Sequence, residues 1–225
     1  MATLAGFDEE ALKLFEEAME ALKDADKGNK LLRQTRLDLA FVLHRLDRFE
    51  EAAPLFLEAL PDIPIVHGAL PEEHMTYQLG AVIALIGAAR WAEAEAPARD
   101  LVGLELKHRP RGHLQRELSH LFLGSILVHL GRFAEAEPIL SDVVPNLPES
   151  VWIHHWAKNL LGGSFAGQGR YDEAEPLLLT GYEKMNPSEG ALRHKRESLE
   201  RVVRLYDAWG KPDKAAEWRL KGETK

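Results

Sequence analysis

Residues 123–140, LGSILVHLGRFAEAEPIL, form the unit that this chain repeats. Two short amphipathic pieces flank the pair Gly131-Arg132, and apolar residues recur in each piece at the three- and four-residue spacing of a helix. Residues 79–87, LGAVIALIG, resemble the first piece. The second piece recurs as FEEAAPLF, WAEAEAPA and YDEAEPLL, which begin at residues 49, 91 and 171. The stretch therefore predicts a helical hairpin that occurs several times along the chain.

An aromatic residue begins each copy of the second piece, at positions 49, 91, 133 and 171, so that successive copies are 42, 42 and 38 residues apart. A degenerate copy follows at Gly210-Lys211-Pro212. Periods of this size with two helices per unit are typical of a solenoid, in which each repeat packs on its neighbours. We therefore predict an all-α fold of about eleven helices.

Turn residues and prolines divide the chain into units. We expect one continuous solenoid over residues 1–225, with complete repeats at 30–60, 72–106, 113–145 and 151–186 and a C-terminal repeat and cap at 190–222. Residues 61–71 contain three prolines and are expected to be a loop. Residues 1–28 hold one helix, at about 11–19, which matches the second helix of a repeat. This half repeat is either an N-terminal cap or, as we favour, a sign that the chain comes from a longer protein.

Four prolines follow the aromatic position of the second helices by five or six residues: Pro54, Pro97, Pro138 and Pro176. Proline within a helix removes a hydrogen bond and clashes with the preceding turn. The first turn of a helix has few paired N–H groups, so proline is tolerated there. We expect these prolines to mark where the second helices begin, and a slight bend is the alternative.

Composition and charge exclude several classes of function. The chain is 45% hydrophobic and 28% charged and contains no cysteine, which rules out disulfides, thiolate metal sites and cysteine nucleophiles. It has no apolar run of the length that a membrane span needs and no basic-then-apolar start, so we expect a cytoplasmic protein without membrane contact.

The net charge of −8 divides into +4 on residues 190–225 and −12 on the rest. An acidic body argues against nucleic-acid binding. The basic tail is either a solvated helix face, which we favour, or a surface that attracts an acidic partner.

The repeat resembles the tetratricopeptide repeat (TPR), in the variant of about 42 residues found in kinesin light chains and many bacterial proteins. The small residue of the family's first helix matches Gly80, Gly124 and Gly162, and the larger residue three positions later matches Ile83, Leu127 and Phe165. The small residue of the second helix matches Ala52, Ala94, Ala136, Ala174 and Ala215. The resemblance covers nearly the whole chain and implies a right-handed superhelix of hairpins. The chain departs from the pattern at Asp47, near Ala88 and at Val203.

The C-terminal part also resembles the repeat region of bacterial serine/threonine protein kinases, in EAEPLLLTGYEKM and the helical stretch that follows it. The kinase itself is absent, since the sequence has no Gly-rich loop, HRD or DFG. Kinase activity is therefore not carried over by this resemblance.

Three side chains could form a metal site, because His113, Glu117 and His120 share one face of a predicted helix. That face continues to Gly124, the close-packing position, so packed or surface histidines are the favoured interpretation. The run Gly162-Gly163-Ser164 matches no phosphate loop or nucleophile elbow and is interpreted as close helix packing. We predict no cofactor, no metal and no enzymatic activity.

In the family that the repeat resembles, the first helices line a concave groove. On that resemblance the partner-binding candidates are Phe41, His44, Arg45, Tyr77, Gln78, Leu121, Phe122, Ser125, His129, Trp156 and Asn159. Trp156 has two open interpretations, a binding anchor or a side chain packed on the preceding repeat. An apolar concavity with a polar rim suits a bound peptide or helix.

Three hypotheses about function follow. The leading one is a non-enzymatic interaction module that binds a protein segment in its groove, as a scaffold or regulatory part of a larger bacterial protein. The second is a regulatory sensor that binds a small peptide or metabolite and controls an attached enzyme such as a serine/threonine kinase. A metal-dependent enzyme that uses the histidines is the third and the least favoured. The sequence leaves the partner and the oligomeric state open.

Overall fold

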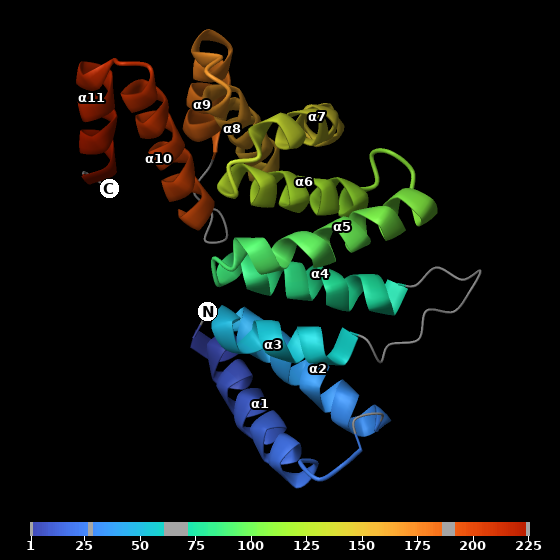
Figure 1. The fold of residues 1–225 in the computed structure, drawn as a ribbon. Coiled ribbons are helices and arrows are strands. Elements are labelled where there is room, and N and C mark those ends of the chain that lie inside the picture. The colour runs from blue at the N-terminus through green and yellow to red at the C-terminus, as the bar shows by residue number, and fades with distance from the viewer. Residues whose placement is uncertain (1, 27–28, 61–71, 186–191, 224–225) are drawn as a thin grey trace. The chain divides into compact units, whose positions relative to one another are not determined.

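The fold is a series of α-helices, which a computed structural model describes for residues 2–26, 29–60, 72–185 and 192–223 (Figure 1). These residues contain eleven α-helices and no strand. None of the described helices is both long and apolar enough to cross a lipid bilayer. The α-helices are α1 (Ala2–Ala21), α2 (Lys30–Arg45), α3 (Phe49–Ala59), α4 (Glu72–Gly87), α5 (Trp91–His108), α6 (Leu114–His129), α7 (Phe133–Val143), α8 (Trp152–Gly167), α9 (Tyr171–Lys184), α10 (Leu192–Ala208) and α11 (Pro212–Glu223).

The chain divides into two compact units, Met1–His108 with α1 to α5 and Arg109–Lys225 with α6 to α11. Within each unit, every helix packs against the next one along the chain. In the second unit α8 also packs against α6 and α10, so the first helices of three successive hairpins lie side by side. This row of first helices forms one face of the second unit.

The second helices α3, α5, α7 and α9 start at the aromatic residues that the repeat marks, positions 49, 91, 133 and 171. The expected helix at 11–19 is wrong in extent, because α1 runs from Ala2 to Ala21. The residues before position 11 include no proline, and helix formers continue the pattern. The predicted loop at 61–71 lies outside the described residues.

The four prolines lie inside the second helices, five or six residues after the aromatic residue. Each second helix begins at its aromatic residue, for example at Phe133 in α7, and Pro138 lies inside that helix. An arginine precedes the aromatic residue in all four second helices, and its backbone forms the N-cap of α3, α7 and α9. The helices therefore begin at the aromatic residues, as expected, and the suggestion that the prolines fix these starts stays a prediction.

The turn between the two helices of a hairpin uses a left-handed backbone conformation. Gly131, Gly169 and Gly210 adopt it with φ of 74°, 76° and 70°. Asp47 and Ala89 adopt the same conformation with φ of 56°, although this region favours glycine. The two departures from the sequence pattern therefore keep the turn geometry at a cost in backbone strain.

Small residues let the two helices of each hairpin approach closely in the second unit. A Cβ at Gly124 of α6 would lie 2.6 Å from Leu140 of α7, and one at Gly162 of α8 would lie 2.8 Å from Leu178 of α9. Ala136 and Ala174, the small residues of the second helices, are fully buried. The predicted packing positions therefore lie at the helix contacts.

Candidate functional site

The face formed by α6, α8 and α10 holds a pocket of about 300 Å³. Its apolar wall comes from all three helices and from the first residue of α7: Val128, Phe133, Ala166, Leu205 and Ala208. Its polar groups come from the end of α6 and from one side of α10: His129, Glu197, Glu200, Arg201 and Arg204. The pocket thus combines an apolar wall with a row of charged side chains.

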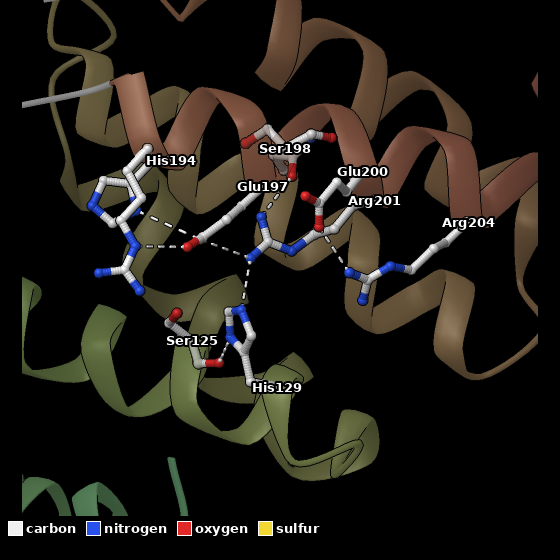
Figure 2. Close-up of polar contacts among 10 residues, drawn as sticks. Ser125, His129, His194, Glu197, Ser198, Glu200, Arg201 and Arg204 are labelled. Carbon is white, nitrogen blue, oxygen red and sulfur yellow. Dashed lines mark hydrogen bonds and ion pairs between the residues drawn. The ribbon is translucent and has the colours of Figure 1, made fainter. Parts of the chain in front are cut away.

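Arg201 is the centre of the polar groups (Figure 2). Its side chain is 7% exposed, and its Nη1 donates a hydrogen bond of 3.3 Å to Oδ1 of Asn159 in α8. Its Nη2 lies 3.5 Å from Nε2 of His129 and 3.6 Å from Oε2 of Glu197. Gly163 makes room for this arrangement, because a Cβ there would lie 3.2 Å from Cδ of Arg201. One guanidinium therefore joins α6, α8 and α10.

His129 is held in one tautomer by its two neighbours. Its Nδ1 lies 2.8 Å from the carbonyl oxygen of Ser125, which can only accept, so Nδ1 carries the proton. Nε2 is then an acceptor that faces the Arg201 guanidinium. Burial, together with the charge of Arg201, lowers the pKa of His129 to about 4. The imidazole is therefore neutral at physiological pH.

Glu197 supplies the negative charge next to Arg201. Burial alone would raise its pKa, but the interaction with His194 and the charge of Arg201 outweigh it and lower the pKa to about 2. Arg193 also donates a hydrogen bond of 3.1 Å from Nε to Oε1 of Glu197. Burial lowers the pKa of Arg201 to about 10, so Arg201 stays charged at neutral pH. The network carries an ionised pair in a low-dielectric site, where such charges interact strongly.

An aromatic cluster adjoins this network. The imidazole of His194 lies against two indole rings, with centroid distances of 4.1 Å to Trp156 and 5.4 Å to Trp152. Phe122 of α6 also contacts Trp156, at 6.0 Å between ring centroids. Trp156 is 1% exposed. Of its two interpretations, the packed side chain is therefore the one that the structure supports.

The groove candidates of the second unit fall into two groups. Phe122 and His129 are half-buried, and His129 lines the pocket. The others, Leu121, Ser125, Trp156 and Asn159, are buried and are not open to a partner in this structure. The side-chain amide of Asn159 donates to the carbonyl of Leu178 in α9 at 3.0 Å. These side chains hold the hairpins together because the first helices pack directly on one another.

In the first unit, aromatic candidates come together. Phe41 of α2 lies 5.7 Å from Tyr77 of α4 between ring centroids, and both are half-buried. His44 packs on Phe49 at 5.5 Å, and burial lowers its pKa. The remaining two candidates, Arg45 and Gln78, form hydrogen bonds with other residues of the first unit. Arg45 binds Asp8 of α1 through Nε at 3.0 Å, and the buried Gln78 donates to the carbonyl of Pro97 at 2.9 Å.

Two of the three sequence-based metal candidates, Glu117 and His120, have protein partners. Oε1 of Glu117 accepts a hydrogen bond of 2.8 Å from the backbone N–H of Gly112. Nδ1 of His120 donates to the carbonyl of Arg116 at 2.8 Å. In the part of the chain that the structure describes, no group of three histidine or acidic side chains is placed to bind a metal ion.

Sequence reasoning missed Glu197 and Arg201, the residues at the centre of the network. The polar first helix of the last repeat was interpreted as the solvated face of a cap, because terminal repeats have an outer face without a neighbour. The signal that could have identified Arg201 is its position. It lies four residues before Leu205 and three after Ser198, on the stripe that α10 buries against the rest of the unit.

Comparisons with known proteins give the class of the fold. The family model described as tetratricopeptide repeat matches residues 33–58 and 118–141, one segment in each unit. No protein with a curated description matches the sequence.

Several solved structures share the fold. A putative kinesin light chain with nearly identical TPR-like repeats from Podosopora anserina is 18% identical and superposes with a TM-score of 0.63, over 85% of this chain and 92% of that one. BtubC (BKLC) from P. vanneervenii is 16% identical, with a TM-score of 0.64 over 96% and 88%. YrrB, a TPR protein with an unusual peptide-binding site, is 18% identical, with a TM-score of 0.51 over 91% and 88%. The predicted all-α, TPR-type fold is confirmed.

Proposed function

We propose that this chain is a protein-binding scaffold and that the second unit holds a segment of a partner protein in the pocket between α6 and α10. The observation that carries the proposal is the pocket itself, in which an apolar wall faces a row of charged side chains on α10. An extended or helical peptide needs an apolar surface for its side chains and polar groups at the rim for orientation. The pocket offers both.

The rim and the floor of the pocket have different roles in this proposal. Arg204 and Glu200 form an exposed ion pair of 3.0 Å at the rim, which can exchange its partners at little cost. Arg201, on the floor, is fixed by Asn159 and Glu197. The rim pair can therefore adapt to a bound segment, while the floor keeps its geometry. Such pre-organisation reduces the entropic cost of binding.

The TPR-type fold supports a binding function, and among the structures that share it YrrB carries a peptide-binding site. The location proposed here rests on the pocket of this chain and not on that likeness.

A peptide selection tests this proposal. A phage-displayed library of random peptides is selected on the immobilised full chain, and each enriched peptide is then measured against variants. Ala208→Trp fills the pocket from the end of α10, and Arg204→Ala removes a rim charge. We expect both variants to bind the enriched peptides more weakly than the wild type. Ala216→Trp places the same indole at an exposed position of α11 outside the pocket and serves as the matched control.

Enrichment of peptides that bind all variants equally would place the binding surface elsewhere. A selection that enriches no peptide would remove the support for a peptide-binding scaffold.

A second candidate is a regulatory sensor that binds a small metabolite. The buried charge of Arg201 on the floor favours it, because small-ligand sites usually combine an apolar wall with a few fixed polar groups. A thermal-shift screen of metabolites separates the two candidates. The sensor predicts a compound that raises the melting temperature of the wild type and leaves that of Ala208→Trp unchanged.

A further inference from the structure

The helix α1 carries an exposed stripe that is apolar and acidic. Phe7 and Leu14 are 68% and 60% exposed, and Glu10 and Glu17 are exposed on the same side of the helix. We call these four residues the acidic stripe. The opposite side of α1 packs on α2 and buries Leu12. Two large apolar side chains on a helix surface form a patch that is typical of interaction sites.

The side of α10 that lies next to α11 carries a stripe of three apolar residues and one arginine, and two of the apolar residues, Leu199 and Val203, also pack against the core of the unit. Leu192 is 47% exposed, Arg196 is exposed, and Leu199 and Val203 are half-buried. These residues follow one another by three or four positions and share one side of the helix. We call them the terminal face. Beside it, Leu199 and Val203 line a hollow between α10 and α11 whose rim includes Arg219.

The two stripes match in spacing. Phe7 and Leu14 are seven residues apart, as are Leu192 and Leu199. Seven residues are two helical turns, or about 10 Å along the axis. Two helices with the same apolar period can therefore interdigitate their side chains along a shared line.

The two stripes also match in charge. The helix α1 contains six acidic residues and one lysine. Residues 190–225, which include α10, contain ten basic and six acidic residues. When the apolar positions are aligned, in either direction, Glu10 lies within about one residue of Arg196 along the helix axis, and Glu17 adds negative charge about two turns further along. Opposite charges at the edge of an apolar contact steer association and fix the register.

We propose that a second copy of this chain covers the acidic stripe, with α1 of one copy packed on the terminal face of the next. Because the two surfaces differ, the contact is head-to-tail and can continue from copy to copy. A second copy is the occupant that the structure favours, since both complementary stripes belong to the same chain. This contact uses the terminal face of α10 and leaves the pocket between α6 and α10 for the partner segment.

Charge reversal tests this proposal. The mass of the full chain is measured by sedimentation velocity over a series of concentrations. We expect species heavier than the monomer to form as the concentration rises and to dissociate as salt screens the charges. The double variant Glu10→Arg/Glu17→Arg, and separately Arg196→Glu, should each lose these species. An equimolar mixture of the two should regain them, because α1 of each variant then meets an opposite charge on the other.

The matched control is Glu9→Arg/Glu16→Arg, which changes the net charge of α1 by the same amount outside the acidic stripe. Circular dichroism confirms that every variant is helical. A wild type that stays monomeric at all concentrations would overturn the proposal. So would oligomers that persist in both reversed variants, or that disappear equally in the control. The peptide selection described above is unaffected by any of these outcomes, because its variants lie in the pocket.

Discussion

Gly124 lacks a side chain at a point where α6 and α7 have no room for one. A Cβ there would lie 2.6 Å from Cδ2 and 2.8 Å from Cγ of Leu140. We expect Gly124→Ala to lower the free energy of unfolding by about 1–3 kcal/mol, because the clash outweighs the better helix propensity of alanine. Chemical denaturation measures the change.

Gly103 is the matched control for this substitution. It also lies inside a helix, α5, but a Cβ there would meet nothing within 4 Å. Gly103→Ala should therefore raise the stability by about 0.5–1 kcal/mol, because alanine restricts the unfolded chain. If Gly124→Ala and Gly103→Ala changed the stability in the same direction and by the same amount, the close contact between α6 and α7 would not be the reason for glycine at position 124.

His129 makes stability depend on pH. Its pKa is about 4 in the folded state against 6.5 ordinarily, so the folded state disfavours the proton. The stabilising contribution of neutral His129 is complete above about pH 6.5 and is lost as the pH falls toward 4. We expect a loss of about 2 kcal/mol over this range from His129. Denaturation of His129→Gln at each pH checks this, since the variant should lose stability less steeply than the wild type.

Glu197 makes stability depend on pH over a lower pH range than His129 does. Its pKa is about 2 in the folded state against 4.5, so its contribution is present above about pH 4.5 and is lost below that. The slope that remains in His129→Gln should therefore steepen below pH 4.5. Equal slopes for wild type and variant between pH 6.5 and 4 would contradict the lowered pKa of His129.

At the scale of the helix, one ion pair recurs at the start of the second helices. Arg132 donates from Nε and Nη2 to the two carboxylate oxygens of Glu135, and pairs of the same kind begin the other three: Arg48–Glu51, Arg90–Glu93 and Arg170–Glu173. In addition, Nη1 of Arg170 donates to Glu137 of the preceding second helix, α7, at 2.8 Å. It therefore links two hairpins.

We expect Arg170→Ala to lower the melting temperature more than Arg48→Ala, because the former also releases a contact between hairpins. Exposed single pairs contribute little to stability, so Arg48→Ala should change it by less than about 1 kcal/mol. Thermal unfolding followed by circular dichroism compares the two variants. An equal loss in both would mean that the bond to Glu137 is not stabilising.

Helix positions could be predicted from the sequence because the repeat sets them. The aromatic residue, the small residue three positions later and the turn glycine fixed most boundaries to within two residues. The start of α1 could not be predicted, since it has no first helix for comparison.

For the whole molecule, the period predicted the class of fold but not the contents of the site. The resemblance placed the binding candidates on the first helices, and His129 does line the pocket. Arg201 lies 72 residues further along the chain, in the repeat that departs most from the pattern. A contact over that distance depends on how the hairpins stack, which no local pattern contains. The burial of Asn159 depends on the same stacking.

The central claim is that the pocket between α6 and α10 holds a segment of a partner protein. Isothermal titration calorimetry of one selected peptide against the wild type, Ala208→Trp and Ala216→Trp tests it most directly. We predict that Ala208→Trp raises the Kd at least about tenfold, or 1.4 kcal/mol, while Ala216→Trp leaves it unchanged. The same Kd for all three proteins would contradict the claim.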